Sequence, residues 1–199
     1  MNPLRASSTK LMIALLMAPT LFVCTTDQAQ RASNHASRAL EMTMRIEPTP
    51  ASQSSVPKFR VELRNVGDHD LILNLGFMLA NGRNQYVNAI VLTIIDPQGK
   101  ARQFELIGPP AVAGRMDPFT LPLPAGSTFS IPVDLDKYWA AASKEFEYKF
   151  QPGRYSLEAR FSGKTVSPQE ANLDMKGIAL MPYWTGTVTS NRLQFEANK

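Results

Sequence analysis

The chain has 199 residues, which suits one sizeable domain and is short for two. Hydrophobic residues make up 44% of the chain and charged residues 19%, a balance that excludes a disordered protein and is typical of a packed globular one. The formal net charge is +4, but the basic residues are scattered among acidic ones. This scatter argues against nucleic acid as a partner, because nucleic-acid binders gather positive charge on one face.

The N-terminal region predicts an export signal. Arg5 and Lys10 precede the apolar run LMIALLMAPTLFV, which is too short to cross a bilayer, and a polar stretch follows it. We therefore expect residues 1–29 to form a signal peptide, residues 30–39 a polar linker, and residues 40–199 the exported domain. The expected location is the periplasm or the extracellular space.

Cys24 is the only cysteine of the chain and closes the apolar run. A single cysteine forms no intramolecular disulfide, so the domain must depend on its hydrophobic core. The segment LFVC resembles the lipid-attachment box of bacterial lipoproteins, in which the cysteine becomes the acylated first residue. The resemblance implies a membrane anchor at Cys24, and the alternative is plain cleavage between Cys24 and Ser33.

From about residue 40 onward, apolar residues recur with a period of two, which predicts half-buried β-strands. PKFRVELRNVG, STFSIPVDLD and GRYSLEARFSG alternate in this way, whereas DLILNLGF and NAIVLTIIDPQGK are more continuously apolar, as in strands covered on both faces. Turn sequences such as NVGD, DPQG, PAGS and QPGR separate the runs. We expect roughly nine strands, at about residues 41–46, 58–65, 70–77, 87–95, 101–106, 127–135, 154–161, 184–189 and 192–197.

These strands predict an all-β fold, an immunoglobulin-like antiparallel β-sandwich of about 7–9 strands. Pro132 lies in the strand at 127–135, and since proline donates no ladder hydrogen bond, we expect that strand at a sheet edge. DPQG has the residue preferences of a type I turn, which predicts a hairpin between the strands at 87–95 and 101–106.

One helix start is convincing, at SPQE. Ser167 can act as the N-cap, Pro168 suits the first helical position, and Glu170 completes a capping box. Gly177 would end the helix. We expect a short helix in this late loop, where it would cover an open end of the sandwich.

The alternation of apolar and polar residues predicts which aromatic side chains near the C-terminus face the core. QPGRYSLEARF resembles the tyrosine corner of immunoglobulin-like domains, in which the hydroxyl of a tyrosine, here Tyr155, bonds to nearby backbone. In YWTGTVTSNRLQFE the alternation places Trp184, Gly186 and Val188 on the inner face. We expect Trp184 in the core, with Gly186 leaving room for a large neighbour, and Tyr183 on the outer face.

A second aromatic group includes Tyr138 and Trp139. Exposed rings can stack against sugars, although rings at a strand end also cap hydrophobic cores. We take Tyr138, Trp139 and Tyr183 as candidate binding residues for a glycan, with a structural cap as the alternative.

Catalytic signals are weak. His35 lies in the linker and His69 in the turn GDHD, no GxSxG motif is present, and Cys24 lies at the leader. Zinc would have too few ligands, and GDHD and DLD lack the spacing of a calcium loop. A pair of catalytic carboxylates, as in glycoside hydrolases, stays an open alternative, because two such residues can meet in space from distant positions in the sequence. We expect no enzyme, no metal and no cofactor.

The segment VELRNVGDHDLILNLGFMLANGRNQYVNAIVLTIIDPQGK resembles the start of the bacterial BsuPI-type proteinase-inhibitor domain and related immunoglobulin-like modules. Asn65, Gly67, Asp96 and Gly99 carry the match, which covers about a fifth of the chain. The resemblance implies an immunoglobulin-like fold and, as one candidate activity, proteinase inhibition.

Together these features predict a non-catalytic exported bacterial β-sandwich that acts as a protein-interaction or structural module of the cell envelope. Its expected partner is another envelope or secreted protein, and it would contact the membrane only if it is lipid-anchored through Cys24. A carbohydrate-binding module is the alternative, and a proteinase inhibitor is a second one.

Overall fold

The computed structural model describes residues 39–48, 56–79, 84–108, 114–144, 148–166 and 181–197. These ranges hold the strands β1 (Leu40–Ile46), β2 (Phe59–Asn65), β3 (Leu71–Leu79), β4 (Gln85–Tyr86), β5 (Ile90–Ile95), β6 (Ala101–Leu106), β7 (Met116–Leu123), β8 (Thr128–Val133), β9 (Tyr138–Trp139), β10 (Gly153–Gly163), β11 (Gly186–Thr189) and β12 (Leu193–Ala197), and the 3-10 turns η1 (Leu135–Lys137) and η2 (Ala141–Ser143). The predicted signal peptide, Cys24, His35 and the helix expected at 167–177 lie outside the described residues.

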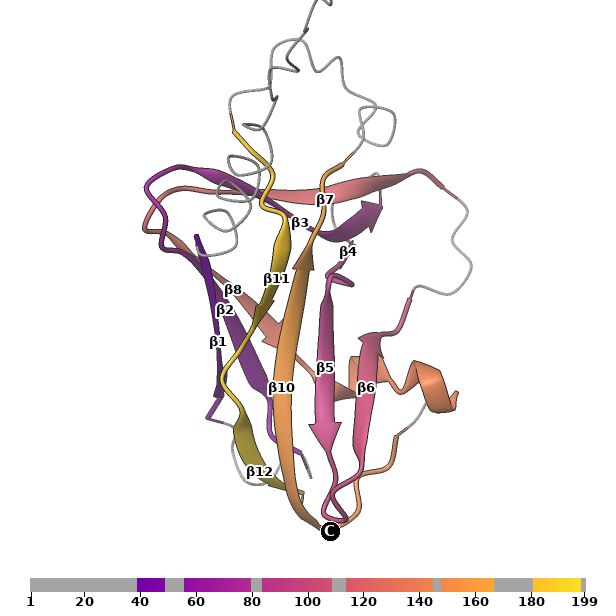
Figure 1. Ribbon diagram of the computed structural model, residues 1–199. Coiled ribbons are helices and arrows are strands. Elements are labelled where there is room, and N and C mark those ends of the chain that lie inside the picture. The colour runs from indigo at the N-terminus through magenta and orange to yellow at the C-terminus, as the bar shows by residue number, and fades with distance from the viewer. Residues whose placement is uncertain are drawn as a thin grey trace, which may run out of the picture.

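Two antiparallel sheets pack face to face. One has the strand order β1-β2-β8, and the other has the order β11-β10-β5-β6-β9, with β12 also pairing with β10. Figure 1 shows β1, β2 and β8 to the left of β5 and β6. The chain is therefore the antiparallel β-sandwich that the alternating sequence predicts.

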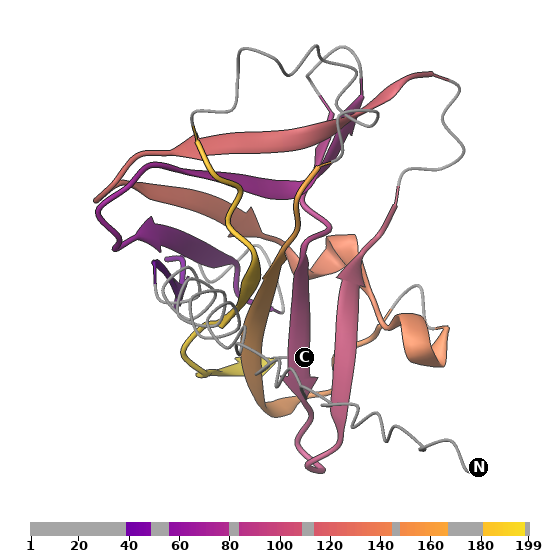
Figure 2. The same ribbon diagram turned by 45° about the horizontal axis from the view of Figure 1, so that its top comes forward.

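A third sheet, of order β4-β3-β7, extends the sandwich at one end. In the chain, β2 leads into β3 and β7 leads into β8, so the β3/β7 pair continues the β2/β8 pair beyond a corner. We call β3, β4 and β7 the ribbon. Figures 1 and 2 show the ribbon crossing over the ends of β5 and β10.

Asn65 occupies the corner and is fully buried. Its side-chain Nδ2 donates to the carbonyl oxygens of His69 (2.8 Å) and Leu123 (3.0 Å), and its Oδ1 accepts the N–H of Gly67 (3.0 Å). Its backbone N–H donates to the carbonyl of Ser127 at 2.9 Å. One side chain thus ties together both strands that turn the corner.

The strand β7 was not predicted from the sequence. Pro118 and Pro122 interrupt its alternation, and proline normally argues against a strand. In the described part of the chain, β7 pairs with β3 alone and is an edge of its sheet, where a missing N–H costs no ladder bond. The same reasoning holds for Pro132, because β8 is the edge of the described β1-β2-β8 sheet, as predicted.

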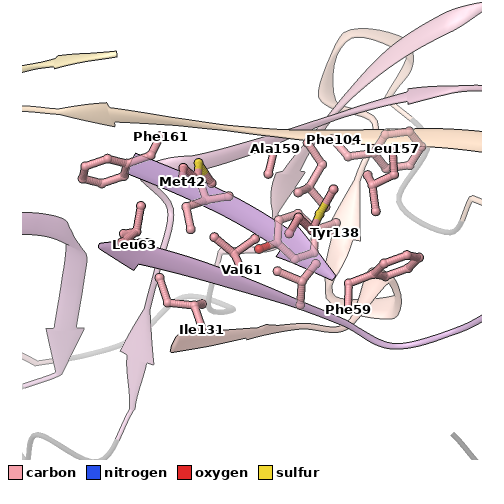
Figure 3. Close-up of a cluster of buried hydrophobic side chains, with 14 of the residues drawn as sticks. Met42, Phe59, Val61, Leu63, Phe104, Ile131, Tyr138, Leu157, Ala159 and Phe161 are labelled. Carbon is pink, nitrogen blue, oxygen red and sulfur yellow. The ribbon is translucent and has the colours of Figure 1, made fainter. Parts of the chain in front are cut away.

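The core lies between the two sheets and follows the predicted alternation. Phe59, Val61 and Leu63 of β2 have no exposed surface, while the residues between them are at least partly exposed. The facing residues of β10 alternate in the same way. Figure 3 shows side chains of both sheets meeting in this core, among them Met42, Val61, Leu63, Ile131, Phe104, Leu157, Ala159 and Phe161.

The tyrosine corner is confirmed. Tyr155 is buried, and its hydroxyl donates to the carbonyl of Gln151 at 2.9 Å and accepts the N–H of the same residue at 2.9 Å. The predicted hairpin is also confirmed, because β5 pairs with β6 and the N–H of Gly99 donates to the carbonyl of Asp96 at 2.9 Å.

The prediction that Trp184 is a core residue is confirmed. Trp184 is 1% exposed and stacks on Phe161, with 5.5 Å between ring centroids. Gly163 gives this ring its room, because a Cβ at Gly163 would overlap the indole. Gly163 pairs with Gly186, whose positive φ of 143° favours glycine for a different reason.

Replacement of Asn65 by alanine should lower the free energy of unfolding by about 2–4 kcal/mol, because two buried carbonyls and one N–H lose their partner. Asn65→Asp should be at least as harmful, since a carboxylate cannot donate to the two carbonyls. Urea unfolding measures both variants. The exposed Gln103→Ala serves as the control and should change stability by less than about 0.5 kcal/mol, and an Asn65→Ala variant as stable as this control would contradict the role given to the corner.

Trp184→Ala should cost about 3–5 kcal/mol, the range for emptying a large aromatic site. Thr187→Ala, on the exposed face of β11, should change stability by no more than about 0.5 kcal/mol. Denaturant melts of the two variants test the strand register, and equal midpoints would show that it is wrong.

Candidate functional site

An apolar groove lies where the ribbon overhangs β8 and the end of β6. Its volume is about 240 Å³. It is lined by Gln85, Val87, Leu106, Phe119, Phe129, Ser130, Ile131, Pro132, Asp134, Lys137 and Tyr138. We call this cavity the ribbon groove.

Three separate parts of the chain form the ribbon groove. Phe119 comes from the inner side of β7, Phe129 and Ile131 come from β8, and Val87 follows β4. Phe119 and Ile131 are buried, and the other two are partly buried against the core. The groove therefore exists because the corner brings β7 back over β8.

The polar rim of the groove is fixed by backbone bonds. The N–H of Lys137 donates to the carbonyl of Asp134 (3.0 Å), which closes the turn η1. The N–H of Ile107 donates to the carbonyl of Lys137 (2.7 Å), which ties this turn to the end of β6. A carboxylate and an ammonium group thus stand beside an apolar interior, as at many recognition sites.

Tyr138 does not offer an exposed ring. It is 5% exposed, its ring lies between the two sheets (Figure 3), and it contributes only to the floor of the groove. Burial raises the pKa of Tyr138 to about 12, so its hydroxyl stays protonated at physiological pH. Tyr138 fits the alternative of a ring that caps the core, because the 3-10 turn η1 has about three residues per turn and places Tyr138 on the same side as the buried Leu135.

The other two candidate binding residues lie elsewhere. Trp139 is partly buried and pairs with Glu105 of β6. Tyr183 is partly buried and forms a parallel bridge with Ile72 of β3. The structure brings Tyr138 and Trp139 together on β9 but places Tyr183 on a different element, so the three rings form no common platform.

A polar and aromatic cluster fixes the β5–β6 hairpin at the opposite end of the sandwich. Asp96 Oδ1 accepts the N–H groups of Gln98 (3.0 Å) and Lys100 (2.8 Å), and Asp96 Oδ2 accepts from Arg102 Nη1 at 2.7 Å. Arg102 also donates to the Tyr148 hydroxyl at 3.0 Å and lies 5.1 Å from the centroid of that ring. Both carboxylate oxygens of Asp96 therefore accept hydrogen bonds, and these bonds stabilise the turn between β5 and β6.

The histidine and the acidic residues that the structure describes are the candidates for a metal or reactive cluster. His69 lies at the surface in the Asn65 corner, beside Asp68. Among the described residues, no group of three or more His, Cys, Asp and Glu side chains could hold a metal ion. None of the helices that the structure describes is long and apolar enough to span a bilayer.

Apart from Tyr138, the residues of the ribbon groove were missed from the sequence. Its walls come from segments that are separate in the sequence, and one of them is the strand β7 that the two prolines concealed. The only available signal was the apolar character of Phe119 and Leu121 between those prolines.

Comparison with known proteins finds no relative: no protein-family model matches the sequence, and no curated protein shows significant similarity to it.

The pKa of Asp96 gives a testable dependence of stability on pH. Burial of the carboxyl alone would raise its pKa, but hydrogen bonds from Lys100, Arg102 and Gln98, together with the Arg102 charge, hold the pKa below its ordinary value of 3.8. A folded-state pKa below the unfolded one stabilises the protein above about pH 4, and this contribution is lost as the pH falls further.

Asp96→Asn should therefore be less stable than the wild type at pH 7 and should lose less stability between about pH 5 and pH 2. Urea unfolding at a series of pH values measures this difference. The exposed Asp68→Asn is the control and should follow the wild-type curve closely. If the Asp96→Asn curve ran parallel to the wild-type curve, Asp96 would not have the partners described above when folded.

Proposed function

We propose that this chain is a non-catalytic exported β-sandwich that acts as a protein-interaction module of the bacterial cell envelope, and that it receives its partner in the ribbon groove. The observation that carries the proposal is a preformed apolar groove beside a sheet edge. Such grooves bind an apolar side chain of an extended or protruding segment, and the polar rim fixes its orientation.

The edges beside the groove favour an anchoring side chain over strand addition. Pro132 removes a backbone donor from β8, and Pro118 and Pro122 remove two from β7. Prolines on edge strands prevent indiscriminate pairing with other chains. Recognition at this end of the molecule therefore depends on what fits between the strands, which provides selectivity for one partner.

Export rests on the N-terminal sequence. The basic residues, the short apolar run and the polar segment after it support a signal peptide, with Cys24 as a possible point of lipid attachment. Carbohydrate binding by Tyr138, Trp139 and Tyr183 has less support, because Tyr138 is buried and Tyr183 lies apart from β9. Proteinase inhibition rests on the resemblance of one segment alone, and failure to slow a panel of serine proteases would remove it.

The test uses the full-length chain with a C-terminal tag, expressed in a bacterial host and captured from the envelope fraction after cross-linking. A protein partner should be recovered with the wild type. Val87→Asp, which places a charge in the groove, and Ser130→Trp, which fills it, should each lose most of that partner. The variant Ile46→Asp alters an exposed apolar residue on β1 and should keep it.

Thermal melts of all variants separate loss of binding from loss of folding. Recovery of the same partner by both folded groove variants would show that the groove is not the binding site. A full-length chain with an intact N-terminus, found in the cytoplasm by fractionation and N-terminal sequencing, would contradict export.

A further inference from the structure

A second cavity, separate from the ribbon groove, lies at the outer face of the β10-β5 sheet. Its volume is about 420 Å³, within the range of small-molecule sites. It is lined by Asn74, Gly76, Phe77, Asn88, Ala89, Val91, Ser162 and Lys164. Figures 1 and 2 show how β3 and β4 pass over the ends of β5 and β10, which forms the roof of this cavity.

Backbone hydrogen bonds join the three segments that surround the cavity. The N–H of Ala89 donates to the carbonyl of Leu75 (3.2 Å), and the N–H of Ser162 donates to the carbonyl of Ala89 (3.2 Å). Gly76 has a φ of 143°, and a side chain there would overlap the carbonyl of Tyr86 and the side chain of Asn88. The walls are therefore fixed before any ligand arrives, which lowers the entropic cost of binding.

The cavity presents several hydrogen-bonding groups. Asn74 uses Oδ1 to accept the N–H of Gly76 (3.2 Å), which leaves its amide nitrogen as a donor. Asn88 offers a second amide and Ser162 a hydroxyl. Two amides and a hydroxyl that converge on one space match the hydroxyl groups of a sugar, because each can donate or accept.

The charge at the cavity is positive. Lys164 is exposed and makes no ion pair with any carboxylate that the structure describes. Arg160 and Ser162 lie on the same outer face of β10, and Lys164 follows two residues after Ser162. Successive residues on one face of a strand are roughly 7 Å apart. Glu158, the next acidic residue on that face, forms an ion pair with Arg192, with 3.3 Å between Glu158 Oε2 and Arg192 Nη2. An anionic group is thus favoured beside Ser162.

One wall of the cavity is apolar. Phe77 lines it and stacks on Tyr86, with 5.0 Å between centroids and 19° between planes. Ala89 and Val91 complete this wall. The C–H face of a pyranose ring packs well on such a surface.

We propose that this cavity binds an acidic saccharide, with the sugar carboxylate at Lys164, its hydroxyls at Asn88 and Ser162, and its apolar face against Phe77. A free inorganic anion would use only the lysine and serine. A lipid chain would leave the amides without a function. This site is independent of the proposed partner site, which lies in the other cavity.

The test is isothermal titration calorimetry of the folded protein with trigalacturonic acid. Three other compounds serve as controls. The neutral methyl ester keeps the sugar but lacks the carboxylate charge, triglutamate keeps the carboxylates but lacks the sugar, and inorganic phosphate supplies negative charge alone. The wild type should bind the trigalacturonate with a measurable heat and bind each of the other three at least about tenfold more weakly.

Lys164→Gln should weaken trigalacturonate binding about tenfold, because it removes one charge-assisted hydrogen bond. Ser162→Ala should also weaken it, whereas Lys149→Gln, which lies before the start of β10 and does not line the cavity, should not. The groove variant Val87→Asp should keep full saccharide binding, which separates this proposal from the proposed partner site. Equal binding of triglutamate or phosphate, an unaffected Lys164→Gln variant, or no heat with trigalacturonate at millimolar concentration would each overturn the proposal.

Discussion

The fold depends on the burial of one amide, that of Asn65. The two sheets of a β-sandwich need only cover each other to bury the core. The two strands of the β2/β8 pair could therefore end at the edge of the core. Here they turn a corner together and continue as β3 and β7. A backbone that bends inside the protein exposes carbonyls to an apolar interior, which is costly unless they find donors. The Asn65 side chain supplies two donor hydrogens and one acceptor there, so the backbone groups around this buried residue have partners while the tip of the corner lies at the surface.

Both cavities follow from that corner. Beyond it the ribbon crosses the end of the sandwich (Figure 2). Residues of the ribbon line both cavities. On the side of β8 the facing side chains are apolar, because they belong to the margin of the core. On the outer face of β10 they are polar, because that face meets solvent. A single bend therefore creates two cavities with different linings.

The sequence predicts what local alternation determines and misses what depends on long-range contact. Period two places Trp184 and Tyr155 in the core correctly, although Trp184 lies two residues before β11. It cannot show that Gly163 makes room for the indole, because that contact joins the end of β10 to the segment before β11. It misses β7, whose prolines are tolerated because the strand lies at an edge, and it leaves the position of Tyr138 open, since the 3-10 turn η1 interrupts the alternation. Each failure concerns a residue whose environment is set by a distant segment.

The residues that carry the resemblance to proteinase-inhibitor domains have structural roles in this chain. Asn65 holds the corner, and Gly67 donates to its side chain. Asp96 accepts two N–H groups of the β5–β6 turn, and Gly99 has a positive φ of 83° in that turn. Residues of this kind specify backbone bends, so a match at these positions concerns the path of the chain more than its activity. Any specific binding must come from side chains that such a motif does not include, and those that surround the two cavities come from the ribbon and from β5, β6, β8 and β10 with their connections.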